Sequence, residues 1–316
     1  MIIEPRAAAI IYNLLMSFSD DKIFLLPSNV CPIVPMTFFK AKRRIEFIDI
    51  SNDTLCMDEE KVLAALKRNP DRYAGVFFVR TFGVNDSFET FFEQIKAIKE
   101  EFIIIDDRCL SVPALNEVKT YADATLYSSG YSKIVDIGFG GYAQIKGHIK
   151  YSKQYMGYSE EDHNYLIQNY KKSIDKNLFF HYTDSNWLNN DSVIVSSEEY
   201  FNLIEQEYTK SINIRSAINK IYSDNLPFDI QLDSRYQVWR FNIRVPNRDA
   251  IVEALFRNNL FASTHYASLN GIFAVGKAAN AEKLHSSIIN LFNNRDYTEE
   301  KAYKTVEVIK RYLDVF

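Results

Sequence analysis

Two hydrophobic periods alternate along the first half of the chain. Short apolar runs, as in strands buried on both faces, are separated by segments in which apolar residues recur every three to four positions, as in amphipathic helices. The runs predict strands at 22–26, 45–48, 75–79, 102–105, 124–127 and 142–145. The helical spacing predicts helices at 7–15, 32–41, 58–66 and from 87 onward. Strands joined by crossover helices form a largely parallel sheet covered on both faces, so an α/β fold is predicted.

The second half follows a different pattern. Residues 148–177 are charged and rich in tyrosine, which indicates helical segments, and apolar residues at helical spacing predict a long helix at 197–223. Strict alternation at 237–245 predicts a strand. Further helices are predicted at 248–258 and, with a cap at Thr298, at the end of the sequence. This change of pattern predicts a smaller α/β unit after the parallel sheet.

Length and composition limit what the chain can be. With 316 residues we predict two domains, a large one at 1–195 and a small C-terminal one at 196–316. Apolar residues make up 47% and charged residues 25%, as in ordinary globular proteins, and the net charge is −4. The sequence has neither a long basic block nor a membrane-length apolar run, so neither nucleic acid nor a membrane is expected as a partner.

The three cysteines, Cys31, Cys56 and Cys109, are scattered and odd in number. They have no C-x-x-C spacing, so they predict neither a disulfide framework nor a zinc site, and no metal is expected. The first residues contain no basic start followed by an apolar run, which is the pattern of an export signal. A reducing cytoplasmic location is therefore predicted.

Candidate catalytic residues follow two of the predicted strands. The strand at 102–105 is followed by Asp106 and Asp107, and the strand at 124–127 leads through a short loop to Lys133. Ligands of parallel sheets bind beyond the carboxyl ends of the strands. There an acid can keep a pyridine nitrogen protonated and a lysine can form a Schiff base, and these two groups hold pyridoxal 5'-phosphate (PLP). Both aspartates are candidates, with Asp107 favoured.

Segments along most of the chain carry a family resemblance. They are Pro27 to Pro32, Ile45 to Ile50, Phe82-Gly83, Ile104 to Asp107, Ser128 to Lys133, Gly140-Gly141, Val245 to Asp249, Leu260 to Tyr266 and Leu284 to Leu291. In order and spacing they resemble the DegT/DnrJ/EryC1/StrS family of PLP-dependent sugar aminotransferases, least clearly at 148–235. This resemblance implies a large domain with the aspartate aminotransferase-like fold of PLP-dependent transferases. It also implies a homodimer, because sites in the family lie at the subunit boundary.

The resemblance implies roles for individual residues. Lys133 matches the lysine that forms the Schiff base and moves the substrate proton, and Asp107 matches the partner of the pyridine nitrogen. Ser128 matches a hydroxyl that binds the cofactor phosphate. Arg6 and Ala7 stand at the phosphate turn that opens the first helix, where free N–H groups favour an anion.

Other positions extend the implied site or depart from the family. His265 matches a position near the sugar substrate. Cys31 stands where many members stack an aromatic ring on the cofactor, Leu110 stands where they have Gln or His, and Pro5 replaces a glycine of the phosphate turn. A proline has no N–H to donate, and Arg6 can compensate by pairing directly with phosphate.

By resemblance, the activity is transfer of an amino group from a donor, glutamate, to a keto group on a nucleotide-linked sugar in polysaccharide synthesis. Two alternatives stay open. One is a PLP-dependent sugar dehydratase of the same fold, in which a histidine takes the lysine position, and Lys133 argues against it. The other is a relative that keeps the fold for binding or assembly without catalysis, which Pro5, Cys31 and Leu110 favour.

Overall fold

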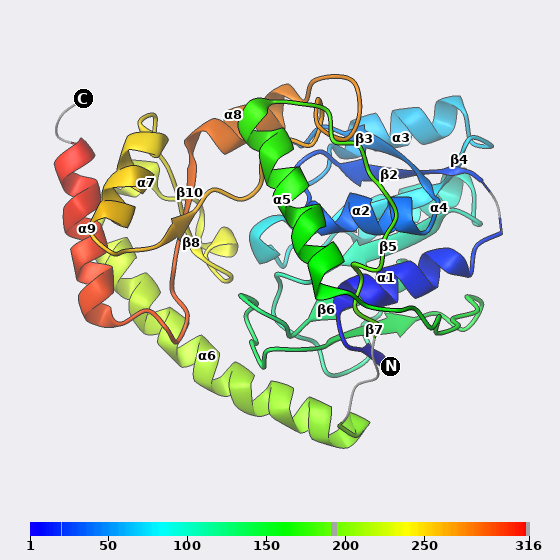
Figure 1. Ribbon diagram of the computed structural model, residues 1–316, viewed down its shortest axis with the longest axis horizontal. Coiled ribbons are helices and arrows are strands. Elements are labelled where there is room, and N and C mark those ends of the chain that lie inside the picture. The colour runs from blue at the N-terminus through cyan, green and yellow to red at the C-terminus, as the bar shows by residue number, and fades with distance from the viewer. Residues whose placement is uncertain (20, 191–194, 314–316) are drawn as a thin grey trace.

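The computed structural model describes residues 1–19, 21–190 and 195–313. It contains a seven-stranded sheet and a separate three-stranded sheet. The two sheets lie in two bodies, which we call the large unit and the small unit (Figure 1). The long helix α6 (Ser197–Asn225) runs along the lower edge of Figure 1 from one body to the other. The predicted α/β class is confirmed.

The large sheet has the strand order β1-β7-β6-β5-β4-β2-β3. Its strands are β1 (Ile2–Glu4), β2 (Ile23–Pro27), β3 (Arg44–Ile48), β4 (Tyr73–Val79), β5 (Ile103–Asp107), β6 (Ala124–Ser128) and β7 (Gly141–Ile145). Strands β2 to β6 run parallel, whereas β7 pairs antiparallel with β6 and β1 pairs antiparallel with β7. Because the parallel strands point the same way, the loops that follow them open onto one edge of the sheet.

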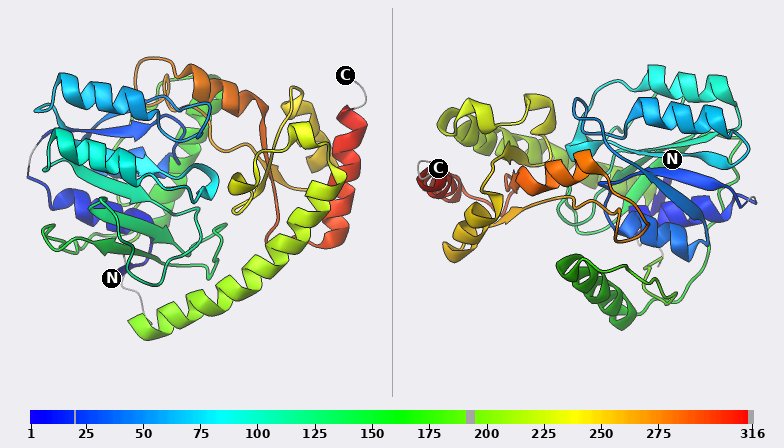
Figure 2. Two further views of the ribbon diagram at one scale, coloured as in Figure 1. Left: turned by 180° about the vertical axis from the view of Figure 1, so that it is seen from behind. Right: turned by 90° about the horizontal axis from the view of Figure 1, so that it is seen from above.

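Helices cover both faces of the large sheet (Figure 2). On one face lie α3 (Glu59–Arg68) and α4 (Glu89–Ile98), and on the other lie α1 (Ala7–Met16) and α2 (Ile33–Lys40). Helix α5 (Glu160–Lys176) contributes to the core on the side of α1 and α2. Strands buried on both sides are continuously apolar, which is why the sequence shows short apolar runs there.

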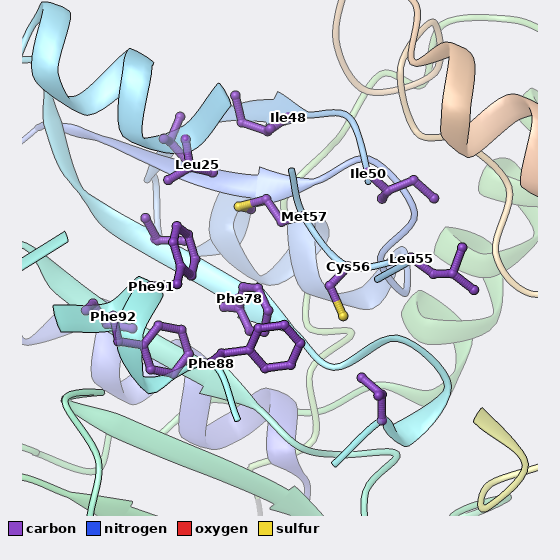
Figure 3. Packing of buried hydrophobic residues seen from close by; sticks show 14 of the residues in the cluster. Leu25, Ile48, Ile50, Leu55, Cys56, Met57, Phe78, Phe88, Phe91 and Phe92 are labelled. Carbon is purple, nitrogen blue, oxygen red and sulfur yellow. The ribbon is translucent and has the colours of Figure 1, made fainter. Parts of the chain in front are cut away.

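Phenylalanine rings fill the core between the large sheet and α4. Phe78 of β4 lies 4.6 Å from Phe88, 5.8 Å from Phe91 and 5.4 Å from Phe92, measured between ring centres (Figure 3). Aromatic pairs in tilted or edge contacts bury much apolar area and fix the orientation of the rings. Because β4 pairs in register with β5, with Phe78 opposite Asp106, this packing holds the carboxyl end of β5 in place.

The small unit consists of a three-stranded antiparallel sheet, the helices on its apolar face and residues 226–240, which connect α6 to the first strand of this sheet. Its strands are β8 (Phe241–Arg244), β10 (Ile288–Leu291) and β9 (Ala262–Ser263). Its helices are α7 (Arg248–Arg257), α9 (Glu299–Leu313) and the second half of α6. These elements share one hydrophobic core, whereas Trp239 and Ile288, the first residue of β10, pack into the core of the large sheet and join the two units.

The strand predicted at 237–245 is shorter in the structure and covers only 241–244. The Gln237 side chain accepts a hydrogen bond from the Asn242 N–H at 2.5 Å and donates one to the Leu232 carbonyl at 2.7 Å. A side chain therefore takes the place of a neighbouring strand at these backbone groups. The sequence pattern also does not predict β1, β9 and β10, which have four residues or fewer.

The division into 1–195 and 196–316 stays a prediction, and it adjoins residues 191–194, which lie outside the described part. Helix α8 (Ala279–Ser287) packs against the core of the large sheet. In the described ranges no helix is long and apolar enough to cross a bilayer. The same ranges place no group of three or more His, Cys, Asp or Glu side chains where it could hold a metal ion.

Candidate active site

A cavity of about 390 Å³ opens where β5 and β6 end. Six of the seven predicted site residues line it: Arg6, Ala7, Cys31, Asp107, Ser128 and Lys133. Its volume is within the range of small-ligand sites. Four larger cavities, of about 820, 760, 590 and 560 Å³, lie elsewhere on the described part of the chain and are lined by none of the seven. The chemistry that the sequence predicts therefore meets in one place.

Asp107 is the last residue of β5 and lines the cavity with 7% of its surface exposed. Its Oδ1 accepts a hydrogen bond from the Cys109 N–H at 2.9 Å. Burial raises the pKa of Asp107 above its ordinary value, and the bond to Cys109 and the charge of Lys133 oppose this rise only in part. A cationic ring nitrogen against this carboxylate would favour its charged form.

Asp106 points to the opposite face of the sheet, because side chains alternate along a strand. It is fully buried, and Arg80 binds it through Nε at 2.9 Å and Nη2 at 3.0 Å. The Nε of Arg108 donates a further hydrogen bond to Asp106 at 2.7 Å. Its carboxylate is thus paired with two guanidinium groups. Of the two aspartates that the sequence left as candidates, Asp107 is the one on the cavity wall.

Lys133 lies half-buried in the loop between β6 and β7 and lines the cavity. Asp136 shapes this loop, because its Oδ2 accepts the Ser132 N–H at 2.8 Å and its Oδ1 accepts the Gly138 N–H at 3.0 Å. Ser132 has a φ of 62°, a region that residues with side chains rarely adopt. The residue before the lysine is therefore held in an unusual conformation by its surroundings.

The first turn of α1 forms another part of the wall through Arg6 and Ala7. The first N–H groups of a helix have no partner within the helix. The Pro5 carbonyl accepts the Gly140 N–H at 2.7 Å, which ties this turn to the loop after β6. Pro5 thus takes part through its carbonyl, and this contact needs no N–H. With the hydroxyl of Ser128 on the same wall, these groups suit a phosphate.

Two thiols face the cavity. Burial raises the pKa of Cys31 and of Cys109, so both stay uncharged. The family resemblance singled out Cys31 but not Cys109. The position of Cys109, two residues after Asp107 at the end of a predicted strand, was the signal that could have identified it. Leu110 is 6% exposed and belongs to the hydrophobic core rather than to the wall.

His265 does not line this cavity. His265 is exposed to solvent, but desolvation by the surrounding protein lowers its pKa to about 4, with smaller contributions from the charges of Arg240 and then Lys133. His265 is therefore neutral at pH 7 and lies within electrostatic reach of the lysine. Burial and the charges of nearby groups, Asp107 among them, raise the pKa of Tyr266, so this tyrosine also lies near the site and was missed from the sequence.

The cavity wall provides suitable groups for the pyridine nitrogen, the aldehyde and the phosphate of PLP. Asp107 can pair with the pyridine nitrogen, and Lys133 can bond to the aldehyde. Arg6, Ser128 and the first turn of α1 can hold the phosphate. Uncharged thiols complete the wall. The residues present therefore fit this cofactor.

Comparison with known proteins gives matches in structure only. A scan against protein-family models and a search of curated proteins find no match. A DegT DnrJ EryC1 StrS aminotransferase from Brucella abortus aligns over 98% of this chain and 85% of that chain, with 17% identity and a TM-score of 0.65. The putative sugar aminotransferase Spr1654 from Streptococcus pneumoniae, in its PLP form, aligns over 98% and 86%, with 13% identity and a TM-score of 0.71.

A third similar structure is the GDP-4-keto-6-deoxy-D-mannose-3-dehydratase of E. coli with bound hydrated PLP. It aligns over 97% of this chain and 86% of that chain, with 16% identity and a TM-score of 0.63. At such identities the likeness shows the fold. The chain has the fold of DegT/DnrJ/EryC1/StrS sugar aminotransferases over nearly its whole length, which confirms the family resemblance at the level of the fold.

Proposed function

We propose that the protein is a PLP-dependent aminotransferase that acts on a nucleotide-linked keto sugar. The observation that carries the proposal is that Asp107 and Lys133 line one cavity together with Ser128 and the first turn of α1. The likeness in fold to sugar aminotransferases supports the reaction type. The dehydratase of similar fold, which is named for a GDP-linked keto sugar, supports the substrate class.

Each residue of the cavity wall would have a separate role in the reaction. Bound PLP would supply an aldehyde and a ring that draws electrons from the substrate carbon. Lys133 would bond to that aldehyde and, once displaced by the incoming amine, carry a proton to and from the substrate carbon through Nζ. Asp107 would keep the ring nitrogen protonated. Arg6, Ser128 and the N–H groups of α1 would bind the phosphate.

Absorption spectroscopy with covalent trapping tests this proposal. PLP added to the wild-type protein is expected to give a visible absorption band that Lys133→Ala abolishes, and borohydride reduction should fix the label on Lys133. Lys146→Ala is the matched control, because the Lys146 side chain is exposed and donates to the Tyr121 carbonyl outside the cavity. Glutamate, the proposed donor, should then bleach the band.

The alternatives make different predictions in the same experiment. Absence of the band, with the protein folded, would contradict the aminotransferase proposal and favour a relative that only binds or assembles. A label on another lysine would show that PLP binds at a different site and that the site assignment is wrong. The dehydratase alternative requires a histidine at the lysine position by resemblance, so a label on Lys133 counts against it.

We also propose that the active form is a homodimer. Tyr131 lines the cavity and is 82% exposed, which leaves a large aromatic side chain uncovered at the rim of the site. Covering such a side chain with a second subunit would remove apolar area from water. Light scattering of the purified protein gives the oligomeric state directly, and a monomer with full PLP binding would contradict this proposal.

A further inference from the structure

We propose that three hydrogen bonds from the small unit fix the loop that carries Lys133, and that Trp239 and Arg215 are positioning residues for its amine. The inference rests on the role proposed above for Lys133. The residues concerned contact the backbone of the loop rather than any reacting atom. They stand outside the set that the sequence pattern and the family resemblance single out.

Three successive carbonyl groups, those of residues 132–134, each accept a hydrogen bond from the small unit. The indole Nε1 of Trp239 donates to the first at 2.7 Å. The Nη2 of Arg215 donates to the carbonyl of the lysine itself at 2.9 Å. The hydroxyl of Ser211 donates to the third at 2.5 Å. A run of three adjacent carbonyls held in this way leaves the backbone around the lysine little freedom.

Arg215 is the centre of this contact. It is 2% exposed, and it also donates to the Ser211 hydroxyl at 2.9 Å, to the Trp239 carbonyl at 2.6 Å and to Asn293 Oδ1 at 2.5 Å. Burial lowers the pKa of Arg215 to about 9, so it remains a cation at pH 7 and its hydrogen bonds are charge-assisted. A planar guanidinium can span these acceptors in a fixed geometry, which a flexible ammonium cannot do.

Trp239 is held independently of its hydrogen bond to the loop. Its ring is 3% exposed and stacks on Phe82, with 6.4 Å between ring centres and 4° between the planes. The carbonyl that it binds belongs to Ser132, the residue with a φ of 62°. A residue with a side chain keeps that conformation only where its surroundings impose it. The bond from Trp239 therefore acts on the strained residue next to the lysine.

Displacement of a reacting group by about 1 Å can cost roughly a hundredfold in rate. The amine of Lys133 is carried on a flexible side chain, so the position of its backbone sets which part of the cavity it can reach. Loss of a contact from the small unit should therefore loosen the loop and slow bond formation at Lys133, without loss of the fold.

Two variants and a matched control test the proposal. Trp239→Phe removes the indole donor and keeps a stacked ring, and Arg215→Lys keeps the charge but not the guanidinium geometry. Trp187→Phe is the control, because Trp187 is 1% exposed and its Nε1 donates to the Tyr182 hydroxyl at 2.9 Å, away from the loop.

Hydrogen–deuterium exchange of the protein without PLP gives the first readout. Amides at 129–141 should exchange roughly five- to tenfold faster in Trp239→Phe and Arg215→Lys than in the wild type, and Trp187→Phe should leave them unchanged. Equal exchange in all four proteins would overturn the inference. Should Arg215→Lys fail to fold, Trp239→Phe decides the matter alone.

The rate of borohydride trapping of PLP on Lys133 gives the second readout. The trapping rate should fall about tenfold in the two variants. The pH midpoint of the visible absorption should also shift, and a change of stability alone would not produce this shift. Wild-type trapping rates and midpoints in variants with faster exchange would overturn the positioning role. If Lys133 is not trapped in the wild type, the proposed function fails, whereas the exchange measurement still decides whether the small unit fixes the loop.

Discussion

The two faces of the large sheet treat neighbouring aspartates of β5 in opposite ways. On one face Asp106 is fully buried and paired with Arg80 and Arg108. On the other face Asp107 borders a cavity, accepts a hydrogen bond from the Cys109 N–H and has a raised pKa because of burial. An aspartate therefore stabilises the fold on the face that carries the arginines. On the face that carries the cavity, an aspartate remains available to a cationic partner. The surroundings, rather than the residue type, separate the two roles.

The largest effect is expected at the paired aspartate. Asp106→Ala leaves the guanidinium groups of Arg80 and Arg108 buried without their carboxylate, so the free energy of unfolding should fall by about 3–5 kcal/mol. Denaturant unfolding of the purified protein measures this loss. A loss below about 1 kcal/mol would show that the pair does not stabilise the fold in the way described.

A smaller loss is expected when only one arginine is removed. Arg108→Gln takes one charged donor from Asp106 and leaves Arg80 in place, so unfolding should become easier by about 2 kcal/mol. The same denaturant titration applies. A loss of stability as large as that of Asp106→Ala would contradict the view that both arginines hold the Asp106 carboxylate.

The aspartate on the cavity should respond with the opposite sign. Asp107→Asn removes a buried charge and keeps an acceptor for the Cys109 N–H, so the protein without PLP should gain about 1 kcal/mol in stability. The same variant should lose the PLP-dependent visible absorption. Thermal unfolding and PLP titration of one preparation measure both, and a loss of stability together with normal PLP binding would contradict this assignment.

The gain from Asp107→Asn should depend on pH in a defined direction. The folded protein binds a proton at Asp107 at higher pH than the unfolded chain does, because burial raises the pKa of Asp107 above its ordinary value of 3.8. The gain is therefore complete above the raised pKa, shrinks as the pH falls through it, and disappears only below 3.8. Unfolding measured at pH 7, 5 and 4 should show it shrinking, and a constant gain would point to a cause other than the charge.

Much of the large unit and of its cavity could be predicted from the sequence. Parallel strands that are apolar throughout give a clear signal, and their carboxyl ends meet at one edge, so Asp107, Ser128 and Lys133 could be assigned to one site. The sequence favoured Asp107 over Asp106, and the structure has Asp107 on the cavity wall. Alternation puts them on opposite faces, but only the packing determines which face carries the arginines and which the cavity.

The contribution of the small unit could not be predicted. Trp239 lies in a segment whose alternation indicated a strand, whereas it precedes β8 and bonds to a residue 107 positions earlier. Arg215 lies inside α6, where a sequence pattern gives no sign that its partner is a loop carbonyl 82 positions away. Contacts of this range depend on how the units pack, and local periodicity does not encode that packing.

Helix α6 has 29 residues, a length of about 44 Å at 1.5 Å per residue. Near its start Tyr200 packs with Tyr142 of the large sheet, and near its end Tyr222 packs with Phe241 of the small one. Both hydrophobic cores therefore pack against one helix, so unfolding of either unit removes contacts from an element that the other unit also uses. In a calorimeter the protein should therefore absorb heat in a single cooperative peak, although it is built around two sheets.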